Sequence, residues 1–420
     1  MLTSGSVIIS LLLIPLRSHP TATIFCWIAT VAVFPPWISF QLMGYRIPAA
    51  ALLSIAIVLV LQGDRKLSWR VADTMVSILA LTSIVSCLSF HTPVHIMTQV
   101  LLEWAACYAA GRWMFEGADF RLVGNRIGGI VGWLAVLQAL MQFNVANIYI
   151  FNMGVPANSW MALQERGGQV RSELTFGHSI ALGAALTLLL PFALQRLGTL
   201  LDQVMVLGLL LGVVATFSRS AMVAAVIVVA ISLLSSRSFG TTKVVGSILI
   251  VAIAWIGISV FTDTVSSSGN GVELTDSTTY REGLLDLVDI VGGIGLAQGG
   301  VPAADGVTYS WGRFYSIDNG LLYLGLYIGW VAVFSYVAIL VIIVWRSTIR
   351  RWTPFSTALV GHIPFVLTVA PITQYQNIYW MMLGAGVSAS YLGSHHTIDE
   401  STNSRRLTSA IEAQSGSFRR

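Results

Sequence analysis

The sequence predicts an all-α fold: a polytopic transmembrane helix bundle with one large extracytoplasmic loop that carries short amphipathic helices. Only 10% of the 420 residues are charged, and the mean hydropathy is +0.77. Soluble domains carry roughly a quarter charged residues. Apolar runs of about 17 to 25 residues recur from end to end, long enough to cross a hydrocarbon core of about 30 Å. The runs are continuous rather than alternating, so they are expected to be helices, which satisfy their own backbone hydrogen bonds in lipid.

Twelve or thirteen spans are predicted, because the first apolar run is short. They are expected at 2–16, 21–40, 47–62, 72–90, 94–114, 124–142, 175–195, 200–217, 220–235, 243–261, 320–345, 355–371 and 375–393. The first run lacks a basic region and a small-residue cleavage site, which argues against a cleavable signal peptide. The three cysteines lie inside apolar runs and indicate no disulfide framework.

The polar segments divide the chain into four parts. Residues 1–261 form the N-terminal transmembrane helices, 262–319 the large extracytoplasmic loop and 320–393 the last three helices. Residues 394–420 are a Ser/Thr-rich tail of disordered composition. A second polar loop, 143–175, interrupts the N-terminal helices.

The positions of the basic residues predict the orientation. One set of alternating loops, together with the C-terminal tail, holds seventeen Lys and Arg residues, and the other set holds six. Since cytoplasmic loops are enriched in Lys and Arg, the first set is cytoplasmic. The C-terminus therefore lies inside and residues 262–319 lie outside.

All six external bases are arginines: Arg46, Arg166, Arg171, Arg219, Arg281 and Arg313. A guanidinium is a planar fork that binds phosphate through two hydrogen bonds, whereas a lysine ammonium is a point charge. The pattern favours recognition of a phosphate group. Chance is the alternative, because the chain holds only two lysines.

Two of these arginines, Arg219 and Arg171, lie beside predicted spans. Arg219 stands in the sequence TFSRS (216–220), where one apolar run gives way to the next. A charge at that depth is costly unless it snorkels, pairs or faces a watery cavity. Arg171 precedes the span at 175–195, and His178 lies just inside it. A lone histidine there is either a hydrogen-bonded structural residue or a proton acceptor.

The large loop carries two candidate elements. Residues 278–291 predict an amphipathic helix with a threonine cap, on which Arg281 shares an apolar stripe with Leu285 and Val288. The alternative is a solvated helix in which Arg281 pairs with a local acid. At the end of the loop, Asp318 and Asn319 precede the span at 320–345. Either residue could cap the helix that begins there. Asp318 could instead serve as a general base.

Other chemistries find little support in the sequence. No His/Cys/Asp cluster has metal-ligand spacing, and no phosphate-binding loop, dinucleotide fingerprint or Ser–His–Asp arrangement is present. We therefore expect no metal, no cofactor and no nucleic-acid partner. Glu103 is the one acid placed deep in a predicted span, which gives thin support for ion-coupled transport.

Taken in order, these motifs resemble the bacterial O-antigen polymerase and O-antigen ligase superfamily. The resemblance covers roughly 165–345 and is carried by GHSIALG (177–183), TFSRS (216–220), Arg281 before a glycine-rich loop, and SIDNG (316–320). Polymerases of this group carry an arginine, ten residues and a glycine in each long external loop. Arg281 with Gly292 fits that pattern, as does Arg166 with Gly177, whereas Arg171 does not but lies nearer the span.

The resemblance implies a metal-independent glycosyltransferase of the bacterial cytoplasmic membrane, with an undecaprenyl-diphosphate-linked saccharide as donor. It implies Arg219 and Arg281 as catalytic residues, and we add Asp318 as a third by the hypothesis that it serves as the general base. Substrate-binding roles are expected for Arg166, Arg171, His178, Arg313 and Asn319. The expected partners are the lipid-linked saccharides, the bilayer, and a chain-length regulator and flippase of the same pathway.

One departure from the family pattern separates the alternatives. Ligases of the superfamily have a His-Asn pair where this chain has Asp318-Asn319, and the histidine is their proposed base. Its absence favours polymerisation of repeat units over ligation to a lipid or protein acceptor. A transporter of lipid-linked saccharides is a third hypothesis, for which broken helices or repeated halves are expected.

Overall fold

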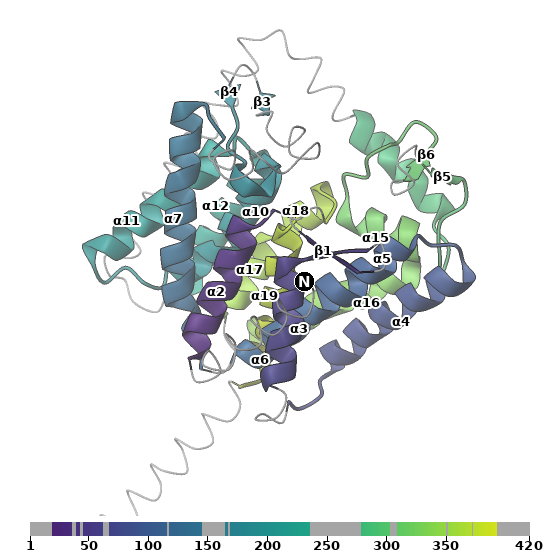
Figure 1. Ribbon diagram of the computed structural model, residues 1–420, viewed down its shortest axis with the longest axis horizontal. Coiled ribbons are helices and arrows are strands. Elements are labelled where there is room, and N and C mark those ends of the chain that lie inside the picture. The colour runs from purple at the N-terminus through teal and green to yellow at the C-terminus, as the bar shows by residue number, and fades with distance from the viewer. Residues whose placement is uncertain are drawn as a thin grey trace, which may run out of the picture.

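The chain is mainly helical in its computed structural model (Figure 1). The structure describes residues 19–35, 39–42, 45–61, 67–115, 117–144, 164–166, 169–235, 279–302, 309–349, 352–371 and 373–392. The predicted spans at 2–16 and 243–261, the tail, and much of both long loops lie outside these residues.

The first half contains the following helices and strands: α2 (Pro20–Val33), β1 (Ser39–Leu42), β2 (Tyr45–Pro48), α3 (Ala49–Leu61), α4 (Val71–Ser89), α5 (Val94–Thr98), the π-helix η1 (Gln99–Ala105), α6 (Ala106–Met114) and α7 (Phe120–Met141). The span predicted at 21–40 ends early, and an antiparallel β1–β2 hairpin follows it. The reason is Pro35, because a residue before proline favours extended backbone and Phe34 has ψ 108°.

The second half begins with two short antiparallel strands, β3 (Glu165–Arg166) and β4 (Gln169–Val170). It continues with η2 (Leu174–Phe176), α10 (Ser179–Ala193), α11 (Leu200–Ala215), α12 (Arg219–Ser235), η3 (Leu285–Ile290), β5 (Gly300–Pro302), β6 (Tyr309–Trp311), α15 (Gly320–Ile328), α16 (Trp330–Ile349), α17 (Pro354–Gly361), α18 (Ile363–Thr368) and α19 (Tyr375–Leu392).

One predicted span is an interrupted helix. The span at 320–345 divides at Gly329, whose φ of +104° is a conformation that favours glycine, so α15 and α16 are separate. The released backbone groups bond to the segment between η3 and β5: Trp330 N donates to Gly292 O at 2.9 Å, and Gly295 N donates to Ile328 O at 2.7 Å. The span at 355–371 has only a one-residue irregularity between α17 and α18, at His362, whose backbone stays helical (φ −86°, ψ −9°).

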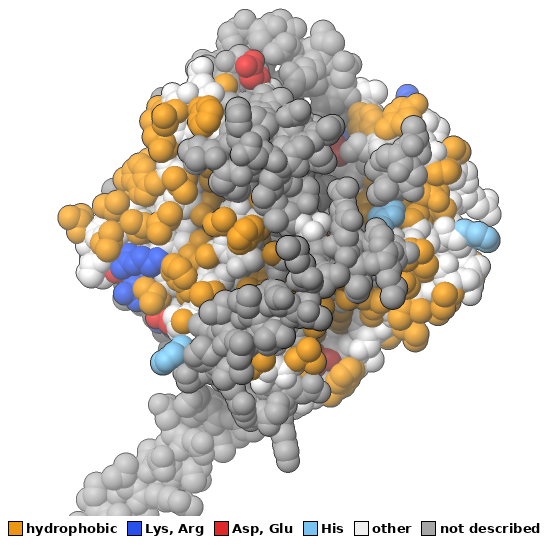
Figure 2. Space-filling view, viewed as in Figure 1, with side chains coloured by type: hydrophobic (Ala, Val, Ile, Leu, Met, Phe, Trp, Pro, Cys, Tyr) orange, Lys and Arg blue, Asp and Glu red, His pale blue; other side chains and the backbone are white. Residues whose placement is uncertain are grey.

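Among the described residues, three helices are both long and apolar enough to cross a membrane: α4, α7 and α16. The shorter apolar helices run over 20–33, 49–60, 179–193, 200–215, 219–235 and 354–368. A 15-residue helix such as α10 is about 22 Å long and falls short of the hydrocarbon thickness. Hydrophobic side chains cover much of the visible surface on both flanks (Figure 2), with Leu88 of α4 and Leu140 of α7 almost fully exposed.

Small residues set the closest helix contacts. A Cβ on Gly111 of α6 would lie 2.0 Å from Met381 O of α19, and a Cβ on Gly384 of α19 would lie 2.0 Å from Tyr108 O. Gly132 of α7 and Gly212 of α11 face each other in the same way. Figure 1 shows α7 and α11 on one flank and α4 and α16 on the other, with α2, α17 and α19 between them.

Ion pairs join loops at one end of the molecule. Arg112 binds Asp73, and the loops around 119 and 196 meet through the ion pairs of Arg196 with Asp119 and Asp202. At the other end, Arg171 and the start of α12 come together, as described below. Which of these ends faces the cytoplasm stays a prediction from the charge pattern.

Candidate functional site

Two predicted site segments meet at the end of α18. Ser220, beside Arg219, hydrogen-bonds Thr368 between hydroxyl oxygens 3.0 Å apart. Asn319 donates from Nδ2 to the carbonyl of Leu367 at 3.1 Å. Because Leu367 and Thr368 are consecutive, the starts of α12 and α15 are attached to neighbouring points.

The Arg171 segment joins the same region. Arg171 Nε donates to Thr216 O at 3.1 Å, and Ser172 N donates to Ala215 O at 3.0 Å. These bonds hold the segment against the turn before Arg219, which is the exposed first residue of α12. The TFSRS turn and the second half of the first long loop therefore form one structural unit.

His178 is the N-cap of α10, where its Nδ1 accepts from Ile180 N at 3.2 Å. Burial lowers the pKa of His178; the nearby Arg171 lowers it further, and Asp318 opposes this. The Nδ1 of His178 therefore has a structural role as the cap of α10.

Asn319, rather than Asp318, caps α15. Its Oδ1 accepts from Leu321 N and Leu322 N, both at 3.0 Å. The Asp318 carboxylate is half-buried and accepts from Ser316 Oγ at 2.8 Å. Asp318 is thus not needed to cap the helix and retains acceptor capacity for another group.

Arg281 and Arg313 lie in the large loop close to Asp318. Tyr280 donates its hydroxyl to Ser316 O, which ties the residue before Arg281 to the Asp318 segment. Arg281 is exposed and makes no ion pair with any residue that the structure describes. The guanidinium of Arg313 lies 5.1 Å from the centroid of the Phe314 ring and covers Gly283.

The predicted apolar stripe of Arg281, Leu285 and Val288 is wrong. Leu285 is 62% exposed, and the buried residues are Leu284, Leu287 and Val291. The helix tightens at Leu285 into the 3₁₀ helix η3, in which side chains three residues apart lie on one face. Arg281 is therefore on the open side of the helix and does not point along a buried stripe.

The helix ends add positive potential to this region. Three helices, α10, α12 and α15, begin here, and helix N-termini carry partial positive charge from unpaired N–H groups. Three non-glycine residues with left-handed backbone lie in the connecting segments: Leu174 (φ 47°), Phe217 (φ 46°) and Thr373 (φ 56°). Such conformations often cluster at functional sites.

Glu173 is a titratable residue that the sequence did not single out. It is 1% exposed, and its Oε2 has no hydrogen-bond partner among the described residues. Burial raises the pKa of Glu173 to about 7, although Arg171 opposes the shift. The sequence feature that could have drawn attention to Glu173 is its position directly before an apolar run.

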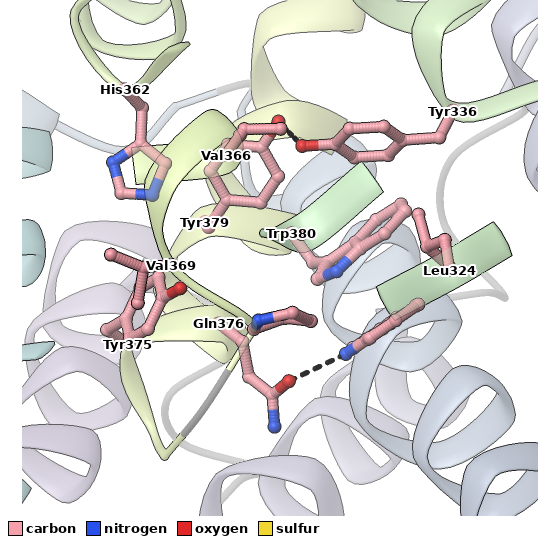
Figure 3. A pocket seen from close by; sticks show the side chains of 12 residues that line it. Leu324, Tyr336, His362, Val366, Val369, Tyr375, Gln376, Tyr379 and Trp380 are labelled. Carbon is pink, nitrogen blue, oxygen red and sulfur yellow. Dashed lines mark hydrogen bonds between the residues drawn. The ribbon is translucent and has the colours of Figure 1, made fainter. Parts of the chain in front are cut away.

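An aromatic pocket lies next to Gly320, the first residue of α15. The space in the pocket, counted together with the open solvent at its mouth, is about 380 Å³. Figure 3 shows Tyr379 between His362 and Tyr336, with Trp380 and Tyr375 also lining the pocket. The lining residues are Trp104, Gly320, Leu324, Tyr336, His362, Val366, Val369, Pro371, Tyr375, Gln376, Tyr379 and Trp380.

Polar groups at the pocket are few. His362 is 2% exposed, stacks on Tyr379, and has no partner for Nδ1 within the described ranges. Gln376 accepts from Gln99 at 2.8 Å and from Trp104 at 2.9 Å, and donates to Glu103 at 2.8 Å. Glu103 therefore belongs to a buried hydrogen-bond network whose helix, η1, has π geometry, which is frequent at functional sites.

Within the residues that the structure describes, no group of three His, Cys, Asp or Glu side chains is arranged to hold a metal ion. Arg166 lies in β3, and its side chain is outside the described part, so its predicted role has no structural account.

The sequence matches no family model, and no similarity to a curated protein or a solved structure was found. The resemblance to O-antigen polymerases therefore stays a prediction, and function has to be inferred from the residues themselves.

Proposed function

We propose that this chain is a membrane-embedded polymerase that joins lipid-linked saccharide repeat units at the external face of a bacterial cytoplasmic membrane. The observation that carries the proposal is the convergence of the segments that hold Arg171, Arg219, Arg281 and Asp318, at the end of the molecule opposite the Arg112–Asp73 ion pair. At that opposite end, α4 begins after Arg70, and α6 and α16 end near Arg112 and Arg346. The C-terminal end of α19 lies there as well.

The chemistry that these groups would serve is glycosyl transfer. A hydroxyl oxygen of the incoming repeat unit attacks the anomeric carbon of the growing glycan, and the bond from that carbon to undecaprenyl diphosphate breaks. The guanidiniums of Arg219 and Arg281 and the helix N-termini bind the departing diphosphate. Asp318 accepts the hydroxyl proton, and Ser316 orients its carboxylate.

The aromatic pocket supports a saccharide substrate. It borders Gly320, next to Asn319 and close to Asp318, and is lined by rings with few polar atoms. Sites for small ligands are typically apolar and aromatic with a few placed polar groups. A sugar ring held against Tyr379 and Trp380 would lie near the proposed base.

One experiment separates the alternatives. Purified protein in detergent receives an undecaprenyl-diphosphate-linked repeat unit without nucleotide or metal, and the products are analysed by gel and mass spectrometry. A ladder of oligomers on the carrier lipid supports the polymerase. Transfer of the glycan to an added acceptor other than the carrier supports a ligase instead.

A transporter is a second candidate, favoured by the break between α15 and α16 at Gly329. Discontinuous helices are typical of transporters, where they line substrate sites. Movement of a verified lipid-linked substrate across vesicles without bond formation would support this candidate and exclude the polymerase.

A further inference from the structure

The Arg112 end of the molecule carries a second cluster of arginines, unrelated to the proposed glycosyl transfer. Arg70 precedes α4, and Arg346 lies in the last turn of α16. Both guanidiniums lie over the ring of Tyr391 from α19, with Cζ 4.3 Å and 3.6 Å from its centroid. One tyrosine thus fixes two cations that are distant in sequence.

The two arginines have no acid to neutralise them among the described residues. Asp73, the acid nearest in sequence to Arg70, is already saturated. It accepts two bonds from Arg112 at 3.0 Å, one from Tyr108 at 2.7 Å and one from the backbone N of Arg70 at 2.7 Å. Both Arg70 and Arg346 are half-buried, and Arg70 Nε is buried without a hydrogen-bond partner there.

The cluster adjoins a surface suited to lipid. Trp69 and Trp345 precede the two arginines and are 70% and 65% exposed. Tryptophan next to arginine at a helix end is typical of the headgroup level of a membrane. From there, exposed apolar side chains continue along α4 and α16: Val71, Leu81, Leu88, Phe334 and Val341.

We propose that Arg70 and Arg346, held on Tyr391, bind the phosphate of an anionic phospholipid headgroup in the cytoplasmic leaflet. Two guanidiniums provide forked donors for phosphate oxygens, and ring contact pre-orients them. The acyl chains lie along the exposed faces of α4 and α16. The proposal depends on insertion in a membrane but not on glycosyl transfer.

The full-length protein in detergent is tested with phosphatidylglycerol, phosphatidylcholine or inorganic phosphate. Bound lipid is counted by native mass spectrometry, and the unfolding temperature is recorded for each mixture. We expect phosphatidylglycerol to bind at least tenfold better than phosphatidylcholine and to raise the unfolding temperature by several degrees. Inorganic phosphate should not reproduce that shift at millimolar concentration; equal protection by phosphate would overturn the lipid assignment.

Variants localise the site. R70Q/R346Q should lose the preference for phosphatidylglycerol, whereas R121Q, which removes an exposed arginine near the start of α7, should keep it. R70K/R346K retains both charges and should lose part of the preference, because the forked contact is gone. If R70Q/R346Q does not fold, the lipid preference of R70K/R346K and of R346Q is compared with that of the natural chain. An unchanged preference in the variants that fold would overturn the proposal, whatever the result of the polymerase assay.

Discussion

At the residue scale, Arg219 and Arg281 are the most direct test of the proposed site. Each Ala substitution should lower polymer formation by about 100-fold or more, because a donor to the departing diphosphate is lost. R219K should also be poor, since lysine lacks the fork. Polymer is measured by gel after confirming membrane insertion. R121A, at the opposite end, is the control, and polymer of normal length and amount from R219A and R281A would refute the assignment.

Asp318 and Asn319 are adjacent in sequence but are expected to differ in role. D318N should reduce turnover and leave the unfolding temperature unchanged, because Asp318 bonds only to Ser316 in the described chain. N319A should lower the free energy of unfolding by about 1 kcal/mol, the usual effect of losing a cap. Both properties are measured on both variants. A D318N enzyme with full turnover would leave Asp318 without a catalytic role.

Glu173 gives a prediction about pH. Because its folded pKa is raised from 4.5 to about 7, the folded state holds a proton that the unfolded state releases. Glu173 therefore destabilises the fold progressively as pH rises from about 4.5 to 7, with no further change above that range. E173Q should flatten this part of the curve of unfolding temperature against pH. Identical curves for E173Q and the natural chain would show that Glu173 ionises normally.

At the element scale, the break between α15 and α16 depends on Gly329. A Cβ there would lie 2.6 Å from Gly293 O, and the φ of +104° is unfavourable for any other residue. G329A should lower the free energy of unfolding by about 1–3 kcal/mol. G198A is the control, because a Cβ at Gly198 meets nothing within 4 Å. Equal unfolding temperatures for the two variants would mean that the break is not tightly packed.

The same element explains why a continuous span was expected at 320–345. Both α15 and α16 are strongly apolar, so hydropathy does not locate the interruption between them. The break is stabilised by backbone bonds from residues 292–297, more than thirty positions earlier. Bonds between segments so far apart are not encoded in a local pattern.

At the scale of the whole molecule, the predicted orientation is testable by labelling. In a chain whose three cysteines are replaced by alanine, Y315C should react with an impermeant maleimide in intact cells. T348C should react only after the membrane is permeabilised. Both positions are exposed, and they belong to opposite ends of the molecule. Labelling of T348C in intact cells would reverse the orientation and move the proposed site to the cytoplasm.

The sequence by itself determined the helical class and most helix positions. These follow from hydropathy and charge, which act along a single segment. The sequence also identified most of the residues whose segments meet around the end of α18. An arginine beside an apolar run is unusual, so it can be recognised without knowing the direction of its side chain. Twelve or thirteen complete crossings remain a prediction, since three described helices reach the required length.

Only the tertiary structure decided which of these residues meet and what each does. It assigned the cap to Asn319, turned Arg281 away from the apolar stripe, buried Glu173 and assembled the pocket from α15, α16, α18 and α19. It also brought Arg70 and Arg346 onto one tyrosine. The physical reason is that burial, pKa and hydrogen-bond partners depend on neighbours from distant segments, and only packing brings those together.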